Sequence, residues 1–392
     1  MGIKFASRME NIKGSAIREL LKLTEEPDII SFAGGLPAPE LFPIKEMEQV
    51  CSRVLQDDGR AAMQYSSTDG YLPLRAKIAK RAEKLGIKTE AKDILITSGS
   101  QQGLEFTGKI FVNDGDVIIC ESPSYLGALS AFRAYQPKFV EVLMDEDGMI
   151  MEELEKALAA NPNAKFIYVI PDFQNPTGRT LSLERRKRLM ELATKYEIPV
   201  VEDNPYGELR FEGEIMPSLK CFDPKNLVIH LGTFSKIFAP GLRLGWVIAE
   251  PEILNKYNLV KQGADLQCST IAQREVDKFL ELYDIEAHIE KIKKVYKVRR
   301  DLMLETMRKE FPESTEFTKP SGGLFAWATF PKEIDASVLL KKALEQRVAF
   351  VPGEPFYPNG GNANHCRLNY SNMPEDKIVE GMTRLAKVLK SM

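Results

Sequence analysis

Between residues 94 and 249 the chain alternates short apolar, β-branched runs with longer amphipathic segments, and this alternation restricts the possible folds more than any other feature. A run of about four to six such residues is typical of a buried strand, whereas residues 183–196 place their apolar side chains on one helical face. Strands that alternate with helices predict a mainly parallel sheet covered on both faces. The runs expected to be strands are ILIT (94–97), VIIC (117–120), FVEV (139–142), FIYVI (166–170), PVVE (199–202), LVIHLG (227–232) and GWVIA (245–249).

The length of 392 residues suits two domains better than one core. The last third has a different pattern, because a long charged helical stretch at 285–311 precedes alternating strand-like and helical pieces. We therefore expect an α/β protein with a large cofactor-binding domain over residues 46–284 and a smaller α+β domain over residues 285–392. Residues 1–45 are expected to form an arm that packs with the small domain and crosses a cleft or a partner subunit.

Charge and cysteine content exclude several classes of protein. The 53 Lys and Arg residues balance 56 Asp and Glu residues, so no overall field would attract nucleic acid or an anionic membrane. The sequence lacks a signal-peptide core and the roughly 18 uninterrupted apolar residues of a membrane span. Five cysteines form no C-x-x-C pair and three histidines form no metal-ligand pair. We therefore expect a cytoplasmic enzyme without a metal site.

The segment GTFSKIFAPGLRLGW at residues 232–246 follows a predicted strand and places a lysine near an arginine. A desolvated lysine near other cations can attack an aldehyde and form a Schiff base, and Ser235 and Arg243 can bind a phosphate. An exposed lysine in a Gly/Pro loop is the structural alternative. The pattern S-K-x-x-x-P-G-L-R-x-G resembles the lysine loop of fold-type I aminotransferases, the class I/II or aspartate aminotransferase superfamily. These enzymes use pyridoxal 5′-phosphate (PLP), and the resemblance makes Lys236 the catalytic residue.

The same resemblance implies further cofactor contacts after other predicted strands. A carboxylate at Asp203 would keep the pyridinium nitrogen protonated, so that the ring can accept electrons. The TSGSQQG segment at 97–103 opens a helical pattern and suits a phosphate. Each of these segments also has a structural interpretation as a turn, a cap or a core tyrosine. The implied cofactor contacts are Ser100, Gln101, Tyr125 (stacked on the ring), Asn175 and Tyr206 (at the ring 3′-oxygen), Asp203, Ser235, Lys236 and Arg243, with Tyr65 supplied by the neighbouring subunit of a homodimer.

Arg367 lies in the strand-like HCRLNY stretch, and an inward-facing arginine needs an anionic partner. That partner is either an internal carboxylate or, as the resemblance implies, the substrate α-carboxylate, which Asn175 would help to orient. The chain is also similar to the branch of LysN-type 2-aminoadipate, kynurenine/aminoadipate and archaeal aromatic aminotransferases. In that branch the arm around Gly35 covers the substrate, and Arg18 matches an arginine that meets a distal carboxylate. Arg18 can equally be a solvated residue on an amphipathic helix, so aminoadipate and aromatic donors both remain open.

The reaction that these residues imply is a ping-pong transamination. An amino group moves from an α-amino acid to a 2-oxo acid, expected to be 2-oxoglutarate, and Lys236 acts as the base. A PLP-dependent β-lyase would use the same cofactor contacts, and the ligand domain of a MocR-type regulator would share the fold. The lack of a basic DNA-binding region disfavours the regulator.

Overall fold

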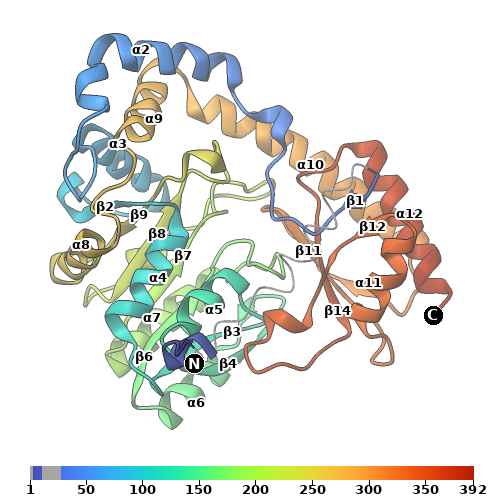
Figure 1. Cartoon of the computed structure of the whole chain (residues 1–392). Helices are drawn as coiled ribbons and strands as arrows, with labels where there is room; N and C mark the ends of the chain where they lie inside the picture. Colours follow the sequence, from blue (N-terminus) through green and yellow to red (C-terminus); the bar gives the residue numbers. More distant parts are fainter. Residues whose placement is uncertain (1–2, 11–27) are drawn as a thin grey trace.

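A computed structural model describes residues 3–10 and 28–392 of the chain. Its main feature is an eight-stranded sheet in which four neighbouring pairs, β3–β4, β3–β6, β6–β7 and β7–β8, are parallel. The predicted mainly parallel sheet with helices on both faces is therefore confirmed (Figure 1). In spatial order the strands are β2 (Ile94–Thr97), β9 (Gly245–Ile248), β8 (Val228–Thr233), β7 (Val200–Asp203), β6 (Ala164–Val169), β3 (Val117–Ser122), β4 (Lys138–Asp145) and β5 (Gly148–Met149).

Two layers of helices cover this sheet because its central strands are apolar on both faces. All residues of β3 are buried, as a strand between two helical layers requires. One core unites α4 (Ser100–Phe111), α5 (Leu126–Arg133) and α8 (Pro251–Ala264) with side chains such as Ile118 and Val201, and another unites α6 (Met151–Ala160) and α7 (Leu183–Tyr196) with Ile119 and Val200. The alternation along each strand thus separates the two cores. Helices α2 (Ile44–Ala62), α3 (Leu72–Ala82) and α9 (Thr270–Leu282) extend the first core.

The C-terminal third forms a second, antiparallel sheet with its own core. Its order is β10 (Glu316–Phe317), β11 (Phe325–Thr329), β14 (His365–Asn369) and β13 (Val351–Pro352), and α11 (Ala336–Glu345) and α12 (Glu375–Lys390) cover one face. A two-residue strand of the arm, β1 (Ile30–Ser31), pairs in parallel with β12 (Val348–Ala349). The arm therefore joins the core of the small sheet.

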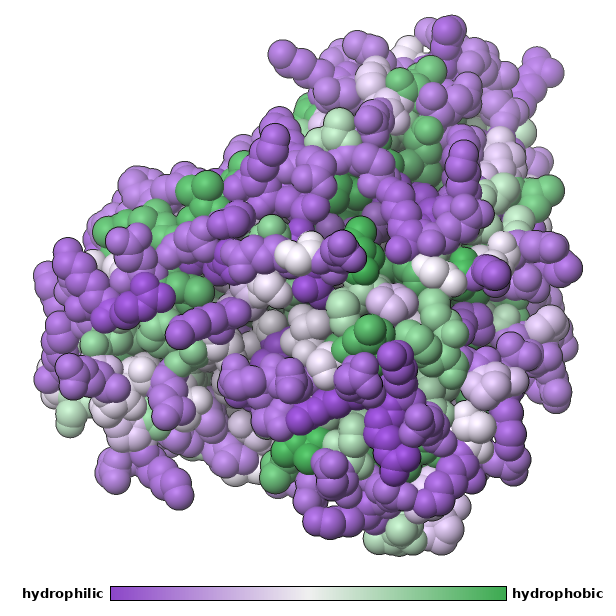
Figure 2. Space-filling view, turned by 180° about the vertical axis from the view of Figure 1, so that it is seen from behind, coloured by the Kyte–Doolittle hydropathy of each residue, from purple (hydrophilic) through white to green (hydrophobic). Residues whose placement is uncertain are grey.

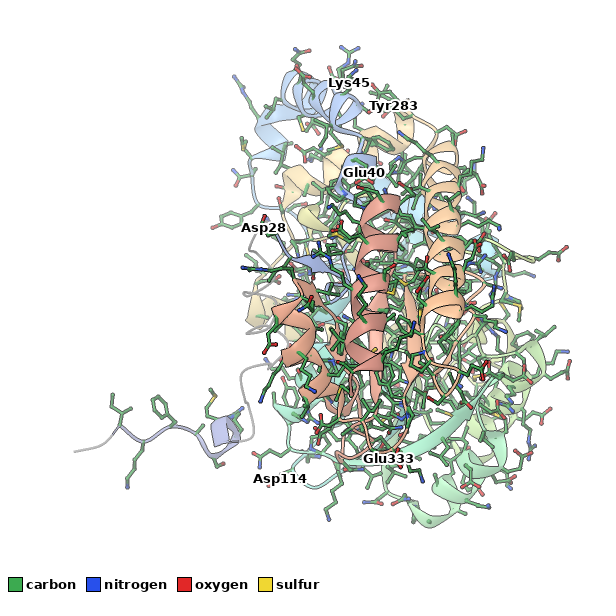
Figure 3. The ribbon with its side chains drawn as sticks, turned by 90° about the vertical axis from the view of Figure 1, so that its right-hand side faces the viewer. Asp28, Glu40, Lys45, Asp114, Tyr283 and Glu333 are labelled. Atoms are coloured by element: carbon green, nitrogen blue, oxygen red, sulfur yellow. The ribbon has the colours of Figure 1, made fainter. Side chains whose placement is uncertain are left out.

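Helix α10 (Ile285–Glu310) connects the two parts of the molecule (Figure 1). Its first half, including Ile289 and Tyr296, packs into the large core, and its second half, including Met303, packs into the small core. Arg299 of α10 pairs with Glu40 of the arm, which lies near the first turn of α12 in Figure 3. The domain boundaries expected after residues 45 and 284 stay a prediction.

The surface agrees with the charged composition. Seen from behind in Figure 2, hydrophilic side chains cover most of the face, and apolar residues are scattered between them. Within the described residues, no helix has both the length and the apolar character needed to cross a membrane.

Candidate active site

The predicted cofactor-binding residues lie at one edge of the large sheet. Strand β9 is antiparallel to both of its neighbours, so β2 and β8 run in the same direction and their last residues, Thr97 and Thr233, flank Gly245. Strand β7 ends beside them, where Asp203 pairs with Leu231. The loops after β2, β3, β6, β7 and β8 hold predicted site residues. The carboxyl ends of parallel strands form the binding edge of such a sheet, so the topology gathers these residues.

Lys236 follows β8 and directs its amine at the arm. Its Nζ donates a hydrogen bond of 2.8 Å to the carbonyl oxygen of Gly35. Burial, followed by the positive charges of Arg367 and Arg243, lowers the pKa of this amine to about 8. More of the amine is therefore neutral at neutral pH than in an exposed lysine, as a nucleophile or a general base requires.

Asp203 ends β7 as a buried carboxyl group with one oxygen unused. Tyr168 Oη donates to Oδ2 at 3.0 Å, whereas Oδ1 has no hydrogen-bond partner in the described part of the chain. Burial raises the pKa of Asp203 to about 7, although the Tyr168 hydrogen bond opposes this shift. A buried polar atom without a partner costs free energy. Oδ1 is therefore suited to accept a hydrogen bond from a ligand.

Arg367 belongs to the small sheet but reaches the large-sheet loop that follows β6. Alternation along β14 buries Cys366 and Leu368 in the small core and turns Arg367 to the other face. Its Nη1 donates to Asn175 Oδ1 at 2.9 Å, and its Nη2 donates to the carbonyl of Ala33 at 2.7 Å. Among residues 3–10 and 28–392 no carboxylate forms an ion pair with it. The internal salt bridge that the sequence left open is thus not formed with the described residues.

Asn175 also connects Arg367 to Tyr206. Asn175 Nδ2 donates to Tyr206 Oη at 3.4 Å, and Tyr206 packs edge-on against Phe325 with ring centroids 6.0 Å apart. The guanidinium carbon of Arg367 lies 4.3 Å from the centroid of the same phenylalanine ring. An aromatic face stabilises a cation without neutralising it. Arg367 is therefore held in place with its charge available to an anionic ligand.

The predicted phosphate site is built from the N-terminus of α4 and from Arg243. Gly99 precedes the first helical residue, Ser100, with a left-handed φ of 69°. A Cβ on Gly99 would lie 2.5 Å from Arg243 Nη2, and this nitrogen donates to the carbonyl of Ser98 at 3.2 Å. Free backbone amides at a helix N-terminus and a guanidinium group together favour a phosphate.

Three further predicted contacts have defined partners. Tyr125 Oη donates to Gln101 Oε1 at 3.5 Å, and Gln101 Nε2 donates to the carbonyl of Gly127 at 2.7 Å. Ser235 Oγ accepts a hydrogen bond from Thr233 Oγ1 at 2.9 Å. The loops after β2 and β3 are thereby fixed to each other. Stacking of Tyr125 on a ring stays a prediction.

Two predicted contacts are not brought to this edge by the described chain. Tyr65 lies between α2 and α3 with 77% of its surface exposed. Its role in a neighbouring subunit stays a prediction. Arg18 lies outside the described residues.

The sequence motifs missed two buried residues that support the site. Tyr168 reads as a core tyrosine in an apolar strand, yet its hydroxyl group meets Asp203. Glu121 Oε2 accepts a hydrogen bond of 3.2 Å from Gln174 Nε2, and Gln174 Oε1 accepts one of 2.7 Å from Thr177 Oγ1. Glu121 thereby holds the loop that contains Asn175. A charged residue at the end of an apolar run was its only signal in the sequence.

These observations fit PLP. The α4 N-terminus with Arg243 suits the phosphate, and the unpaired oxygen of Asp203 suits a protonated ring nitrogen. Lys236 supplies a buried amine with a lowered pKa for the aldehyde.

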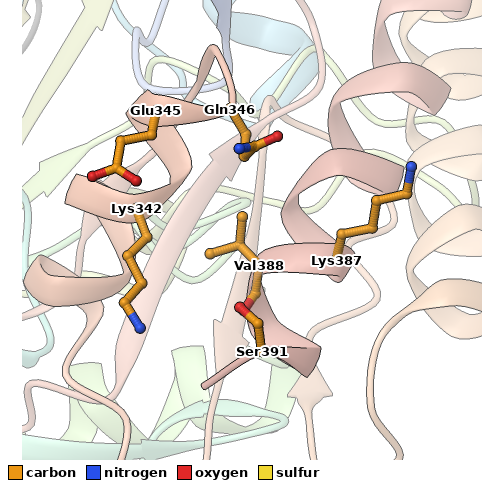
Figure 4. A pocket seen from close by; sticks show the side chains of 6 residues that line it. All are labelled: Lys342, Glu345, Gln346, Lys387, Val388 and Ser391. Atoms are coloured by element: carbon orange, nitrogen blue, oxygen red, sulfur yellow. The ribbon is translucent and has the colours of Figure 1, made fainter.

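A groove elsewhere on the molecule contains none of the predicted residues. It has a volume of about 440 Å³ and lies between α11 and α12 in the C-terminal third of the chain (Figure 4). Its lining is of mixed charge and consists of Lys342, Glu345, Gln346, Lys387, Val388 and Ser391. This groove is therefore separate from the candidate active site.

Comparison with known proteins supports this assignment over nearly the whole chain. Residues 35–385 match the family model for class I and II aminotransferases. Aromatic-amino-acid aminotransferase 1 of Thermococcus litoralis is 46% identical over 98% of this chain and 94% of its own length. The Thermus thermophilus LysN structure, an α-aminoadipate aminotransferase complexed with N-(5′-phosphopyridoxyl)-L-leucine, matches with a TM-score of 0.93 and 41% identity over 99% of this chain and 97% of that one. A Pyrococcus horikoshii kynurenine aminotransferase, solved with PMP, KYN and KYA, matches with a TM-score of 0.95 and 42% identity over the same shares of the two chains.

Proposed function

The chain belongs to the class I and II aminotransferases, and from this membership we propose that this PLP-dependent enzyme takes 2-aminoadipate, an aromatic amino acid or a broader set of α-amino acids as donor. We expect 2-oxoglutarate to be the acceptor. The observation that most favours this reaction is the position of Arg367, a buried cation to which no carboxylate of the described residues pairs. Arg367 is close enough to Lys236 to lower the pKa of its amine. A substrate α-carboxylate on Arg367 would place the α-carbon near the base. No observation supports the β-lyase alternative.

Bound PLP supplies an electron-withdrawing ring that stabilises negative charge at the substrate α-carbon. The protein residues do the remaining work. Lys236 Nζ takes the proton from the α-carbon, and Arg367 with Asn175 binds and orients the α-carboxylate. Asp203 Oδ1 holds a proton at the ring nitrogen, and Tyr206 with Asn175 binds the ring 3′-oxygen. Ser100, Gln101, Ser235 and Arg243 hold the phosphate, Tyr125 covers the ring and Gly35 borders the substrate.

We also propose that the enzyme is a cytoplasmic homodimer with shared active sites. Tyr65 is 77% exposed, and apolar Ile3 and Phe5 of the arm are 82% and 77% exposed, so a second copy would cover them. Mixed dimers provide the test. A dimer of one Lys236→Ala subunit and one Tyr65→Ala subunit retains one intact site if Tyr65 acts across the interface. It retains one impaired and one dead site if Tyr65 acts within its own subunit.

The donor is tested with a panel of 2-aminoadipate, kynurenine, phenylalanine, leucine, alanine and glutamate, each with 2-oxoglutarate. The panel is repeated with Arg18→Ala and, as a matched control in the same arm, with Arg8→Ala. A loss confined to the dicarboxylic donors in Arg18→Ala supports recognition of a distal carboxylate. An equal loss for all donors would contradict that role. No amino transfer from any donor would refute the proposed function.

A further inference from the structure

Tyr168 reaches the active site from within the sheet. It lies on β6 beside Val201 of β7, and residues paired in this way point to the same face. Asp203 is two residues beyond Val201 and therefore lies on that face as well. The tyrosine ring packs edge-on against Phe132 of α5, with ring centroids 5.6 Å apart, and is fully buried. Its hydroxyl group ends 3.0 Å from Asp203 Oδ2.

We propose that Tyr168 is a positioning residue that holds Asp203 through Oδ2, so that Oδ1 is the oxygen presented to the cofactor ring nitrogen. In the described residues the Tyr168 hydroxyl group is the one hydrogen-bond donor to this carboxyl group, and Oδ1 is left without a partner. A carboxylate bound at one oxygen has lost its rotational freedom before a ligand arrives, which lowers the entropic cost of binding. The inference rests on the role proposed above for Asp203.

The phenol also opposes the effect of burial on Asp203. Burial disfavours the carboxylate, whereas a donated hydrogen bond stabilises it. Three other ionisable groups interact electrostatically with Asp203. His230 of β8 favours the carboxylate form, whereas Glu121 of β3 and Tyr206 after β7 repel it when they are ionised. None of these three donates a hydrogen bond to Asp203. Removal of the Tyr168 hydroxyl group should therefore raise the pKa of Asp203 above about 7.

The first test measures Asp203 in the apoprotein, so that it does not depend on the cofactor. Infrared difference spectra against Asp203→Asn follow protonation of this carboxyl group with pH. We expect Tyr168→Phe to move the midpoint upward by roughly one pH unit, because a hydrogen bond to a charged group is lost. Tyr257→Phe is the matched control, since Tyr257 is equally buried and its hydroxyl group meets Thr107 at 2.6 Å, away from the site. An equal midpoint in wild type and both variants would overturn the proposal.

The second test measures binding of pyridoxamine 5′-phosphate to the apoprotein by equilibrium dialysis. Tyr168→Phe should weaken binding roughly tenfold at neutral pH. Its affinity should also fall at a higher pH than that of wild type as the solution is acidified, because less Asp203 is ionised. Unchanged binding in Tyr168→Phe, together with weakened binding in Asp203→Asn, refutes the inference alone. Unchanged binding in Asp203→Asn refutes the proposed role of Asp203 itself.

A variant expected to shift the Asp203 midpoint in the opposite direction tests the proposal if Tyr168→Phe does not fold. 3-Fluorotyrosine at position 168 preserves the hydroxyl group and makes it a stronger donor. It should lower the Asp203 midpoint and leave the fold intact. An unchanged or raised midpoint would contradict the proposal.

Discussion

Arg186 and Arg367 are both buried arginines close to the loop after β6, but they have different partners. Arg186 donates to Asp172 Oδ1 at 2.8 Å and to three backbone carbonyls, so it has an anionic partner within the fold, which it shares with Arg210. Among residues 3–10 and 28–392, Arg367 meets only the amide oxygen of Asn175, the carbonyl of Ala33 and aromatic rings. A buried charge without a counter-ion costs free energy. Burial alone therefore does not identify a binding cation, whereas a missing internal anion does.

The same contrast separates two buried lysines, Lys261 and Lys236. Lys261 is fully buried and pairs with Asp265 at 2.8 Å. Lys236 donates to the carbonyl of Gly35 and lies near two arginines. We interpret the Lys261–Asp265 pair as a structural contact. Lys236, which lies near cations, is interpreted as the reactive amine. The following predictions test whether this division holds.

The largest effect is expected from Lys236→Ala. It removes the amine that we propose attaches PLP and acts as the general base, so turnover should fall by at least about 10⁴-fold. The free energy of unfolding of the apoprotein should change little. Steady-state kinetics, the visible absorbance of bound PLP and chemical denaturation measure these quantities. In the matched variant Lys261→Met we expect the opposite result. The free energy of unfolding should fall, but the molecules that stay folded should keep their turnover. Near wild-type turnover in Lys236→Ala would disprove its assignment.

Arg186→Met should have the largest effect on stability. Asp172 keeps its pair with Arg210, but three backbone carbonyls lose the donor that Arg186 supplies. Each buried acceptor left without a partner costs about 1–3 kcal/mol, so we expect a total loss of at least about 3 kcal/mol. The control is Arg188→Met on the same helix, where an exposed arginine pairs with Glu155 and a change of at most about 1 kcal/mol is expected. Chemical denaturation of both variants gives the comparison. Equal losses would show that Arg186 does not act through its buried partners.

Arg367→Met should lower kcat/KM roughly 100-fold for every amino donor, because each has the same α-carboxylate. The free energy of unfolding should stay the same or rise, since a buried charge without a counter-ion is removed. Arg367→Lys should recover only part of the activity, because an ammonium group lacks the paired donors. A stability loss as large as that of Arg186→Met would remove the distinction between the two arginines.

The smallest effect is expected at the exposed Arg243. Gly99→Ala should displace its guanidinium group and weaken binding of pyridoxamine 5′-phosphate about tenfold. Gly115→Ala is the control, because Gly115 also has a positive φ but a Cβ there would meet nothing within 4 Å. Equilibrium dialysis of both apoproteins separates backbone strain from displacement of Arg243. Similar affinities in the two variants would argue against a close fit at Gly99.

Local patterns were sufficient to predict much of this protein. Short β-branched runs correspond to strands because such side chains fill a sheet that is buried on both faces. The motifs at their carboxyl ends contain Lys236, Asp203 and Asn175, whose roles were expected from the resemblance to a known family and stay predictions. The chain could not reveal that β9 runs antiparallel between β2 and β8, since strand order is set by packing between distant segments.

Partners across the fold are the part that only the tertiary structure decided. Tyr168 is an ordinary core residue until β6 and β7 lie side by side and bring its hydroxyl group to Asp203. Arg367 is one of many arginines until the small sheet turns it toward Asn175 and Ala33, more than 190 positions away in the sequence. The sequence by itself determined which chemical groups are available and at which strand ends they lie. The tertiary structure decided which charges are neutralised and which stay unpaired, because an electrostatic partner is chosen by distance in space and by burial.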